Sequence, residues 1–155
     1  MIKVERRVLT VEEQEIFIEH LERTKSWYEE MYKLMLLTGM RIGEVGGLQW
    51  GDIDFTNRFI SIKRSLSYQY EDGVKTIFFT SPKTENSVRK IPFFGETKDI
   101  LMRQFEKQKA KRADMGKKWK QPKDMDDLIF TTSLGTPIGR YTIENDMRNI
   151  TKTDK

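Results

Sequence analysis

An arginine and a glutamate stand three positions apart at the end of an apolar stretch. The stretch is "LLTGMRIGEVGGLQW" (36–50), in which Arg41 comes two residues after Gly39 and Glu44 lies three residues beyond. A guanidinium binds phosphate through two parallel hydrogen bonds, stays charged at any working pH and stabilises charge that builds up on phosphoryl oxygens. The alternative is an ordinary Arg41–Glu44 ion pair on a helix surface, which contributes roughly a few tenths of a kcal/mol. The local pattern by itself favours the ion pair.

A phosphate-binding arginine needs a rigid base, and the residues around Arg41 could supply one. Gly39 suits the left-handed position that ends a helix. A second, short helix then begins directly after Arg41, and its N-terminus attracts anions. Glu44 could hold the head of the arginine in place.

Lys83 is the second candidate. It lies in "SPKTENSVRKIPF" (81–93), a polar connection between expected strands. A lysine at the tip of a hairpin can reach into a groove and donate a proton to a leaving oxygen. The alternative is a lysine that only keeps a turn soluble, and Lys83 taken alone favours that alternative.

The two stretches together, followed by "DLIFTTSLGTP" (127–137), resemble the catalytic domain of tyrosine recombinases (phage-type integrases), especially those of conjugative transposons. The matching positions of the first stretch are Thr38, Gly39, Arg41, Glu44, Leu48, Trp50, Asp52, Ile53 and Asp54. Those of the second stretch are Lys83, Thr84, Ser87, Arg89, Ile91 and Pro92.

The resemblance implies a role for each matched site residue. Arg41 would be the first of two arginines that bind the scissile phosphate, and Glu44 its acidic companion. Lys83 would contact DNA and protonate the departing 5′-hydroxyl, with Arg89 and Lys90 as further DNA contacts. The family cuts and rejoins DNA through a 3′-phosphotyrosyl intermediate, without a metal or nucleotide cofactor. The implied partner is double-stranded DNA, on which the full-length protein forms a tetramer.

Part of the family's site has no counterpart here. A His-x-x-Arg box and a late tyrosine nucleophile should follow the last expected helix. The only histidine, His20, lies in the first helix, where we expect an exposed side chain. The tyrosines also lie too early in the chain, at Tyr28, Tyr32, Tyr68, Tyr70 and Tyr141. We therefore expect a fragment that covers the N-terminal two-thirds of the catalytic domain and does not cleave DNA by itself.

Two other functions remain open at this point. The first is a stand-alone, non-catalytic DNA-binding module of the same fold. The second is a basic α+β domain that binds RNA or an acidic protein, but it does not explain the linked Arg41 and Lys83 stretches. The aromatic residues also resemble core residues more than a stacking platform for bases.

Composition narrows the class of protein further. With 155 residues, 37% of them hydrophobic, the chain is long enough for one folded domain with a core. It has neither a secretory signal nor an apolar run long enough for a membrane span. The lack of cysteine excludes disulfides and thiolate metal sites and fits a reducing cytoplasm. The resemblance implies a bacterial or mobile-element origin.

The net charge of +4 is unevenly distributed. Between Arg103 and Lys123 there are nine basic residues against two acidic ones. Such a block attracts a polyanion such as the DNA backbone. The alternative is a solvated helix face that continues into a lysine-rich loop.

The elements expected to position these residues define an α+β fold, mostly helical with one small antiparallel sheet. Residues 1–9 form an N-terminal segment or linker, and 10–155 the partial catalytic domain. Capping boxes at Thr10/Glu13 and Ser26/Glu29 predict helices to about residues 23 and 38, and a short helix should cover 42–48. Strands should fill 58–93, with a hairpin turn at "EDGV". A helix over 97–112 with Leu101 and Phe105 on its apolar face, a basic loop over 113–126, a buried segment "DLIFTT" and a last helix should follow.

Overall fold

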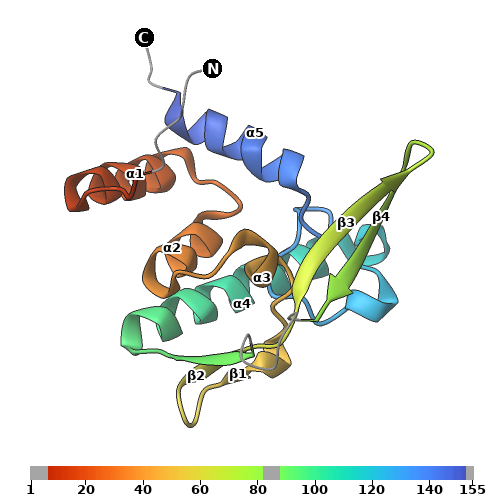
Figure 1. Cartoon of the computed structure of the whole chain (residues 1–155), viewed down its shortest axis with the longest axis horizontal. Helices are drawn as coiled ribbons and strands as arrows, with labels where there is room; N and C mark the ends of the chain where they lie inside the picture. Colours follow the sequence, from red (N-terminus) through yellow and green to blue (C-terminus); the bar gives the residue numbers. More distant parts are fainter. Residues whose placement is uncertain (1–6, 82–87, 153–155) are drawn as a thin grey trace.

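The computed structural model describes residues 7–81 and 88–152, which form the predicted α+β fold (Figure 1). Its helices are α1 (Val11–Thr24), α2 (Glu29–Thr38), α3 (Ile42–Gly46), α4 (Gly95–Met115) and α5 (Arg140–Thr151). Its strands are β1 (Ile53–Asp54), β2 (Phe59–Ile62), β3 (Ser65–Glu71), β4 (Val74–Thr80) and β5 (Arg89–Pro92). Short 3-10 turns lie at Trp50–Asp52, Gly116–Lys118 and Lys123–Met125.

The strands form two sheets, where the sequence predicted one. In the first sheet β2 is central and pairs antiparallel with β1 and β5. The second sheet is the β3–β4 ribbon, which projects from the body of the molecule in Figure 1. The predicted turn of this ribbon is confirmed, because Asp72 and Gly73 both have positive φ, at 49° and 77°. Two such residues in succession give the turn that matches the twist of a hairpin.

The two predicted capping boxes have different outcomes. Thr10 and Glu13 form theirs at the start of α1. The box predicted at Ser26 and Glu29 is wrong, because α2 begins only at Glu29 and Tyr28 is its N-cap residue. The Ser26 hydroxyl instead donates to the Asp146 carboxylate of α5, at 2.7 Å. The same hydroxyl accepts the Tyr28 N–H at 3.1 Å, so Ser26 joins the chain before α2 to α5 and does not cap the helix.

The predicted buried segment at 127–132 is confirmed and organises one side of the core. Leu128, Ile129 and Phe130 are buried, although the segment has no regular strand. Its backbone carbonyls therefore need other donors. The side-chain amides of Gln104 and Gln108 on α4 donate to the carbonyls of Ile129 and Leu128, each at 2.8 Å.

These hydrogen bonds alter the face of α4 that the sequence predicted to be apolar. Leu101 is buried as expected, but Phe105 is 40% exposed and packs edge-on against Trp50, with ring centroids 5.4 Å apart. Gln104 and Gln108 take the buried positions instead. The helix also extends beyond the predicted 97–112, so that residues 113–115 of the predicted loop are helical.

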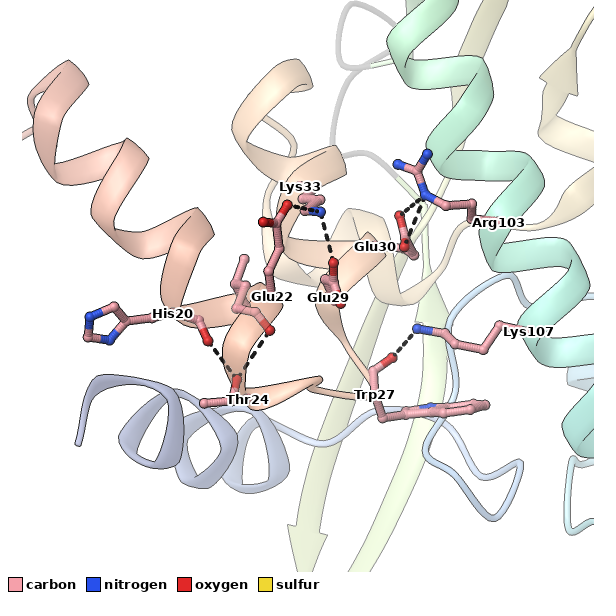
Figure 2. A network of polar contacts seen from close by, with 10 residues as sticks. His20, Glu22, Thr24, Trp27, Glu29, Glu30, Lys33, Arg103 and Lys107 are labelled. Atoms are coloured by element: carbon pink, nitrogen blue, oxygen red, sulfur yellow. Dashed lines mark hydrogen bonds and ion pairs between the residues drawn. The ribbon is translucent and has the colours of Figure 1, made fainter. Parts of the chain in front are cut away.

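A polar network ties the start of α2 to α4 and α1 (Figure 2). Arg103 on α4 contacts the buried Glu30 carboxylate at 3.3 Å. Lys107 donates to the Trp27 carbonyl at 2.7 Å. Lys33 bridges Glu29 and Glu22 at 2.8 and 3.0 Å. The helix that leads to Arg41 is therefore anchored at its far end.

A glycine on α3 allows this helix to lie directly against β3. A Cβ atom at Gly43 would overlap Ser65 Oγ and would stand 3.2 Å from the Leu66 carbonyl oxygen. The serine side chain can rotate away, but the backbone carbonyl is part of the ribbon. The residue after Ile42 must therefore lack a side chain for α3 to keep its position.

We predict that Gly43→Ala lowers the free energy of unfolding by about 1–3 kcal/mol, the usual cost of forcing an extra carbon into a packed interface. Urea denaturation followed by circular dichroism measures the change. Gly95→Ala is the matched control, because no atom lies within 4 Å of a Cβ added there. Equal stability of the two variants would contradict the close-approach argument.

Candidate functional site

The corner between α2 and α3 is fixed by its backbone. The Gly39 N–H donates to the Met35 carbonyl at 2.9 Å, and its φ of +67° reverses the chain as predicted. Met40 is 3% exposed and inserts into the core. Arg41 follows as the N-cap residue of α3, with an exposed side chain. The short helix predicted over 42–48 is confirmed, although it ends at Gly46.

Glu44 binds the main chain of Arg41, whereas the sequence analysis placed it against the guanidinium. Its Oε2 accepts the Arg41 N–H at 2.9 Å. The Arg41 carbonyl accepts the Val45 N–H at 3.0 Å, so both polar groups of this peptide unit are used. Within residues 7–81 and 88–152, no ion pair joins the Arg41 side chain to Glu44. The surface-pair alternative therefore does not describe the structure.

The ion-pair partner of Glu44 is Arg89, at the start of β5. Nη1 and Nη2 of Arg89 donate to Oε1 and Oε2 of Glu44 at 2.8 and 2.9 Å. The carboxylate side chain is 11% exposed and the arginine side chain 42%. The hydrogen bonds from Arg89 lower the pKa of Glu44, and the N–H of Arg41 adds to this effect. The same contact raises the pKa of Arg89.

The structure thus brings together three of the five predicted site residues. Arg41, Glu44 and Arg89 form one cluster, which joins the α2–α3 corner to the first sheet. Lys90 is not part of it, because successive residues of a strand point to opposite faces. Its Nζ lies 4.3 Å from the centre of the Phe59 ring on β2. Lys83 lies outside the described residues.

Arg64, which is not among the residues predicted from the sequence, holds the other end of α3. Asp52 is 4% exposed, and its carboxylate accepts hydrogen bonds from Arg64 Nη1 at 2.5 Å and from the Gln49 N–H at 2.9 Å. Arg64 also donates to the Gly47 carbonyl at 3.2 Å. No local pattern identifies a partner that lies 12 residues away, in the connection between β2 and β3. The matched position Asp52 therefore stabilises the turn after α3.

The basic block from Arg103 to Lys123 is not one uniform surface. Arg103 and Lys107 belong to the network that anchors α2. Burial lowers the pKa of Lys107, which also lies over the Trp27 ring. Apart from Arg103, the exposed cations of the block are Lys109, Arg112, Lys117, Lys118, Lys120 and Lys123.

The hydroxyls of Tyr32 and Tyr68 form hydrogen bonds with residues of α5. The Tyr32 hydroxyl donates to Asp146 at 2.8 Å, and burial raises its pKa. Burial raises the pKa of Tyr28 to about 12. The Tyr68 hydroxyl accepts the Arg140 N–H at 3.1 Å. Tyr70 and Tyr141 are 65% and 75% exposed.

His20 differs from the exposed side chain that we predicted. It is half-buried, and its Nδ1 lies 3.1 Å from the Ile150 carbonyl oxygen of α5. A carbonyl can only accept, so Nδ1 carries the proton. His20 thus helps to dock α5 against α1.

Residues 7–81 and 88–152 contain neither a cluster of metal ligands nor a helix that could span a membrane. No group of three or more metal-ligating side chains lies close together among these residues. None of the described helices is long and apolar enough to cross a membrane.

Comparison with known proteins gives consistent matches. The model of the phage integrase family matches residues 7–155. The transposase of transposon Tn916 from Enterococcus faecalis is 33% identical over 103 residues, which are 64% of this chain and 24% of that protein. A XerC-like tyrosine recombinase from Caldanaerobacter subterraneus is 30% identical over 131 residues, which are 81% of this chain and 31% of that protein.

Solved structures of the Tn1549 transposon integrase share the fold. In its complex with transposon right-end DNA, the match has a TM-score of 0.69 and 28% identity, over 87% of this chain and 41% of the integrase chain. In a complex with circular intermediate DNA, the TM-score is 0.75 at 25% identity, over 95% and 46% of the chains. The chain thus spans less than half of the length of these relatives.

We predict a defined pH dependence for the Glu44–Arg89 pair. The pKa of Glu44 is lower in the folded protein than its usual value of 4.5. Its stabilisation is therefore fully present above the unfolded pKa and is lost as the pH falls through the folded pKa. Glu44→Gln should cost about 1–3 kcal/mol at pH 7 and progressively less below pH ~4.

Urea denaturation at pH 7, 5 and 3 measures this difference. Glu144→Gln removes the exposed pair between Arg140 and Glu144 on α5 and serves as the control. We expect it to leave the free energy of unfolding almost unchanged, because both side chains of this pair are exposed to solvent. A Glu44→Gln deficit that stays constant from pH 7 to pH 3 would rule out this role of the carboxylate.

Proposed function

The chain belongs to the phage integrase family, and from this premise we propose that it is part of a site-specific DNA recombinase that binds double-stranded DNA through the Arg41 corner. The complete enzyme cuts and rejoins DNA strands through a 3′-phosphotyrosyl intermediate, as a tetramer on DNA in the bacterial cytoplasm. One observation carries the proposal: the exposed Arg41 side chain extends from a corner whose backbone is fixed by hydrogen bonds. These bonds use the Gly39 N–H and both the N–H and the carbonyl of Arg41.

Such an arrangement suits phosphoryl transfer. The reaction depends on positioning and on neutralising charge as it develops on the phosphate oxygens. A guanidinium on a rigid base provides both, because it need not be ordered again when the phosphate arrives. Arg41 binds the scissile phosphate in this proposal, while Glu44 fixes its base. Lys83 protonates the leaving 5′-hydroxyl, and Arg89 and Lys90 were predicted to add DNA contacts.

The relatives support DNA as the partner. The Tn1549 integrase structures hold transposon-end and circular-intermediate DNA. The exposed cations between Lys109 and Lys123 give this chain a second basic surface for phosphate contacts.

We further propose that this polypeptide, by itself, binds DNA without cutting it. A nucleophilic tyrosine needs a hydroxyl that is free to approach the phosphate and that loses its proton readily. Tyr32 donates to Asp146, Tyr28 is buried with a raised pKa, and Tyr68 accepts a backbone N–H. Tyr70 and Tyr141 are exposed, but both lie before the position at which the family's nucleophile is expected. A stand-alone, non-catalytic DNA-binding module is the second candidate function, which the environments of Tyr28, Tyr32 and Tyr68 support for the isolated chain.

We predict that Arg41→Ala weakens binding to a duplex about tenfold or more, because one charge-assisted contact to phosphate is lost. The slope of log K against log salt should fall by about one phosphate contact. Fluorescence anisotropy at several salt concentrations measures both quantities. Arg148→Ala, an exposed cation in the last turn of α5, is the matched control. If both variants lose the same affinity, Arg41 has no special role.

We also predict that the chain forms no covalent adduct with DNA. Incubation with a nicked suicide substrate, followed by denaturing electrophoresis, tests this directly. The expected result is free protein in every lane. A slower, SDS-resistant band that disappears on substitution of one of the five tyrosines would identify a nucleophile and refute the prediction.

A further inference from the structure

We propose that Arg89 is a positioning residue of the phosphate site: through Glu44 it fixes the main chain at Arg41 and keeps the carboxylate away from the Arg41 guanidinium. This inference rests on the proposed function of Arg41 and revises the direct DNA contact predicted for Arg89.

The Glu44 carboxylate occupies the terminal nitrogens of the Arg89 guanidinium. Both of its terminal nitrogens donate to Glu44, at 2.8 and 2.9 Å, in the two-bond arrangement that arginine makes with a carboxylate. A phosphate would have to compete for the same planar edge. The pair also has no net charge, so it attracts a polyanion weakly. Arg89 is therefore poorly placed to bind DNA directly.

The Glu44 carboxylate has another contact, with the main chain of Arg41. Glu44 Oε2 accepts from Arg89 Nη2 and from the Arg41 N–H, at 2.9 Å in each case. One oxygen atom thus joins strand β5 to the residue that starts α3. The link crosses 45 positions of the sequence between Glu44 and Arg89.

Without Arg89, the Glu44 carboxylate would lose its ion-pair partner. Its side chain is only 11% exposed, so an unpaired charge there would be costly. Arg41 is the other cation that lowers the pKa of Glu44. The carboxylate would gain by turning to the Arg41 guanidinium and would neutralise the group that should bind phosphate.

Arg89 is itself anchored in the first sheet. It opens β5 and stands opposite Ile62 on β2, a residue that is 3% exposed. The strand supplies a fixed origin for the side chain, and the fork geometry fixes the orientation of Glu44. The Arg41 N–H is then held by a chain of contacts that leads to the sheet.

Hydrogen exchange of the Arg41 amide tests the inference without DNA. In Arg89→Ala we expect this amide to exchange about tenfold faster, the effect of losing a hydrogen bond to an oriented charged acceptor. Arg89→Lys keeps the charge without the fork and should give an intermediate rate. The Gly39 amide, which donates to the Met35 carbonyl, is the internal reference. Arg140→Ala is the control variant and should leave the Arg41 amide unchanged.

If Arg41 exchanges at the wild-type rate in folded Arg89→Ala or Arg89→Lys protein, the inference is overturned. Thermal unfolding of each variant establishes that the exchange is measured on folded protein.

The direction of the change in DNA affinity then distinguishes a positioning role of Arg89 from a direct contact with DNA. If Arg89 positions the site, Glu44→Gln and Arg89→Ala each weaken duplex binding, and the double variant is no weaker than the worse single one. If Arg89 contacts phosphate, Glu44→Gln frees it and tightens binding, and that result would overturn the inference. Failure of the wild-type chain to bind any duplex would refute the proposed function, while the amide measurement would still decide the role of Arg89.

Discussion

The contact between α3 and β3 determines where Arg41 stands. Helix α3 has five residues, too few to be stable by itself in water. It persists because tertiary contacts hold it at three places. Gly43 lets its side lie on the Leu66 backbone, Glu44 at its first turn reaches Arg89, and the Gly47 carbonyl beyond its end accepts from Arg64. Arg41 owes its fixed origin to these partners more than to the helix.

Interactions between neighbours in the chain could be predicted from the sequence. The Thr10–Glu13 box, the left-handed Gly39 and the Asp72–Gly73 turn depend on residues that are at most a few positions apart. The partners of Glu44 and Asp52 could not be predicted in this way. Arg89 lies 45 positions after Glu44, and Arg64 lies 12 positions after Asp52, in the connection between β2 and β3. Only the folded chain brings these charges together, and the sequence alone does not identify which cation pairs with each carboxylate.

Helix α4 shows why a hydrophobic pattern can misplace a face. Its sequence predicts that Leu101 and Phe105 point inward, and hydrophobicity gives no reason to bury Gln104 and Gln108, which share this face of the helix. The structure buries both glutamines, because the irregular segment at 127–132 brings carbonyl groups into the core that need donors. The demand for hydrogen bonds comes from carbonyl groups 20 and 25 positions further along the chain, so the pattern of α4 alone does not contain it. Phe105 is displaced to the margin and packs on Trp50.

The exposed Arg41 side chain has an evolutionary consequence. Within the described residues, neither the hydrogen bonds nor the ion pairs involve its guanidinium, so the fold would lose little by its replacement. Gly43 and Asp52, by contrast, serve packing and local geometry and would be retained by selection for folding alone. In a lineage that had ceased to act on DNA, the glycine and the aspartate would persist while position 41 drifted. The identity of this one residue across descendants therefore records whether the proposed phosphate site is still in use.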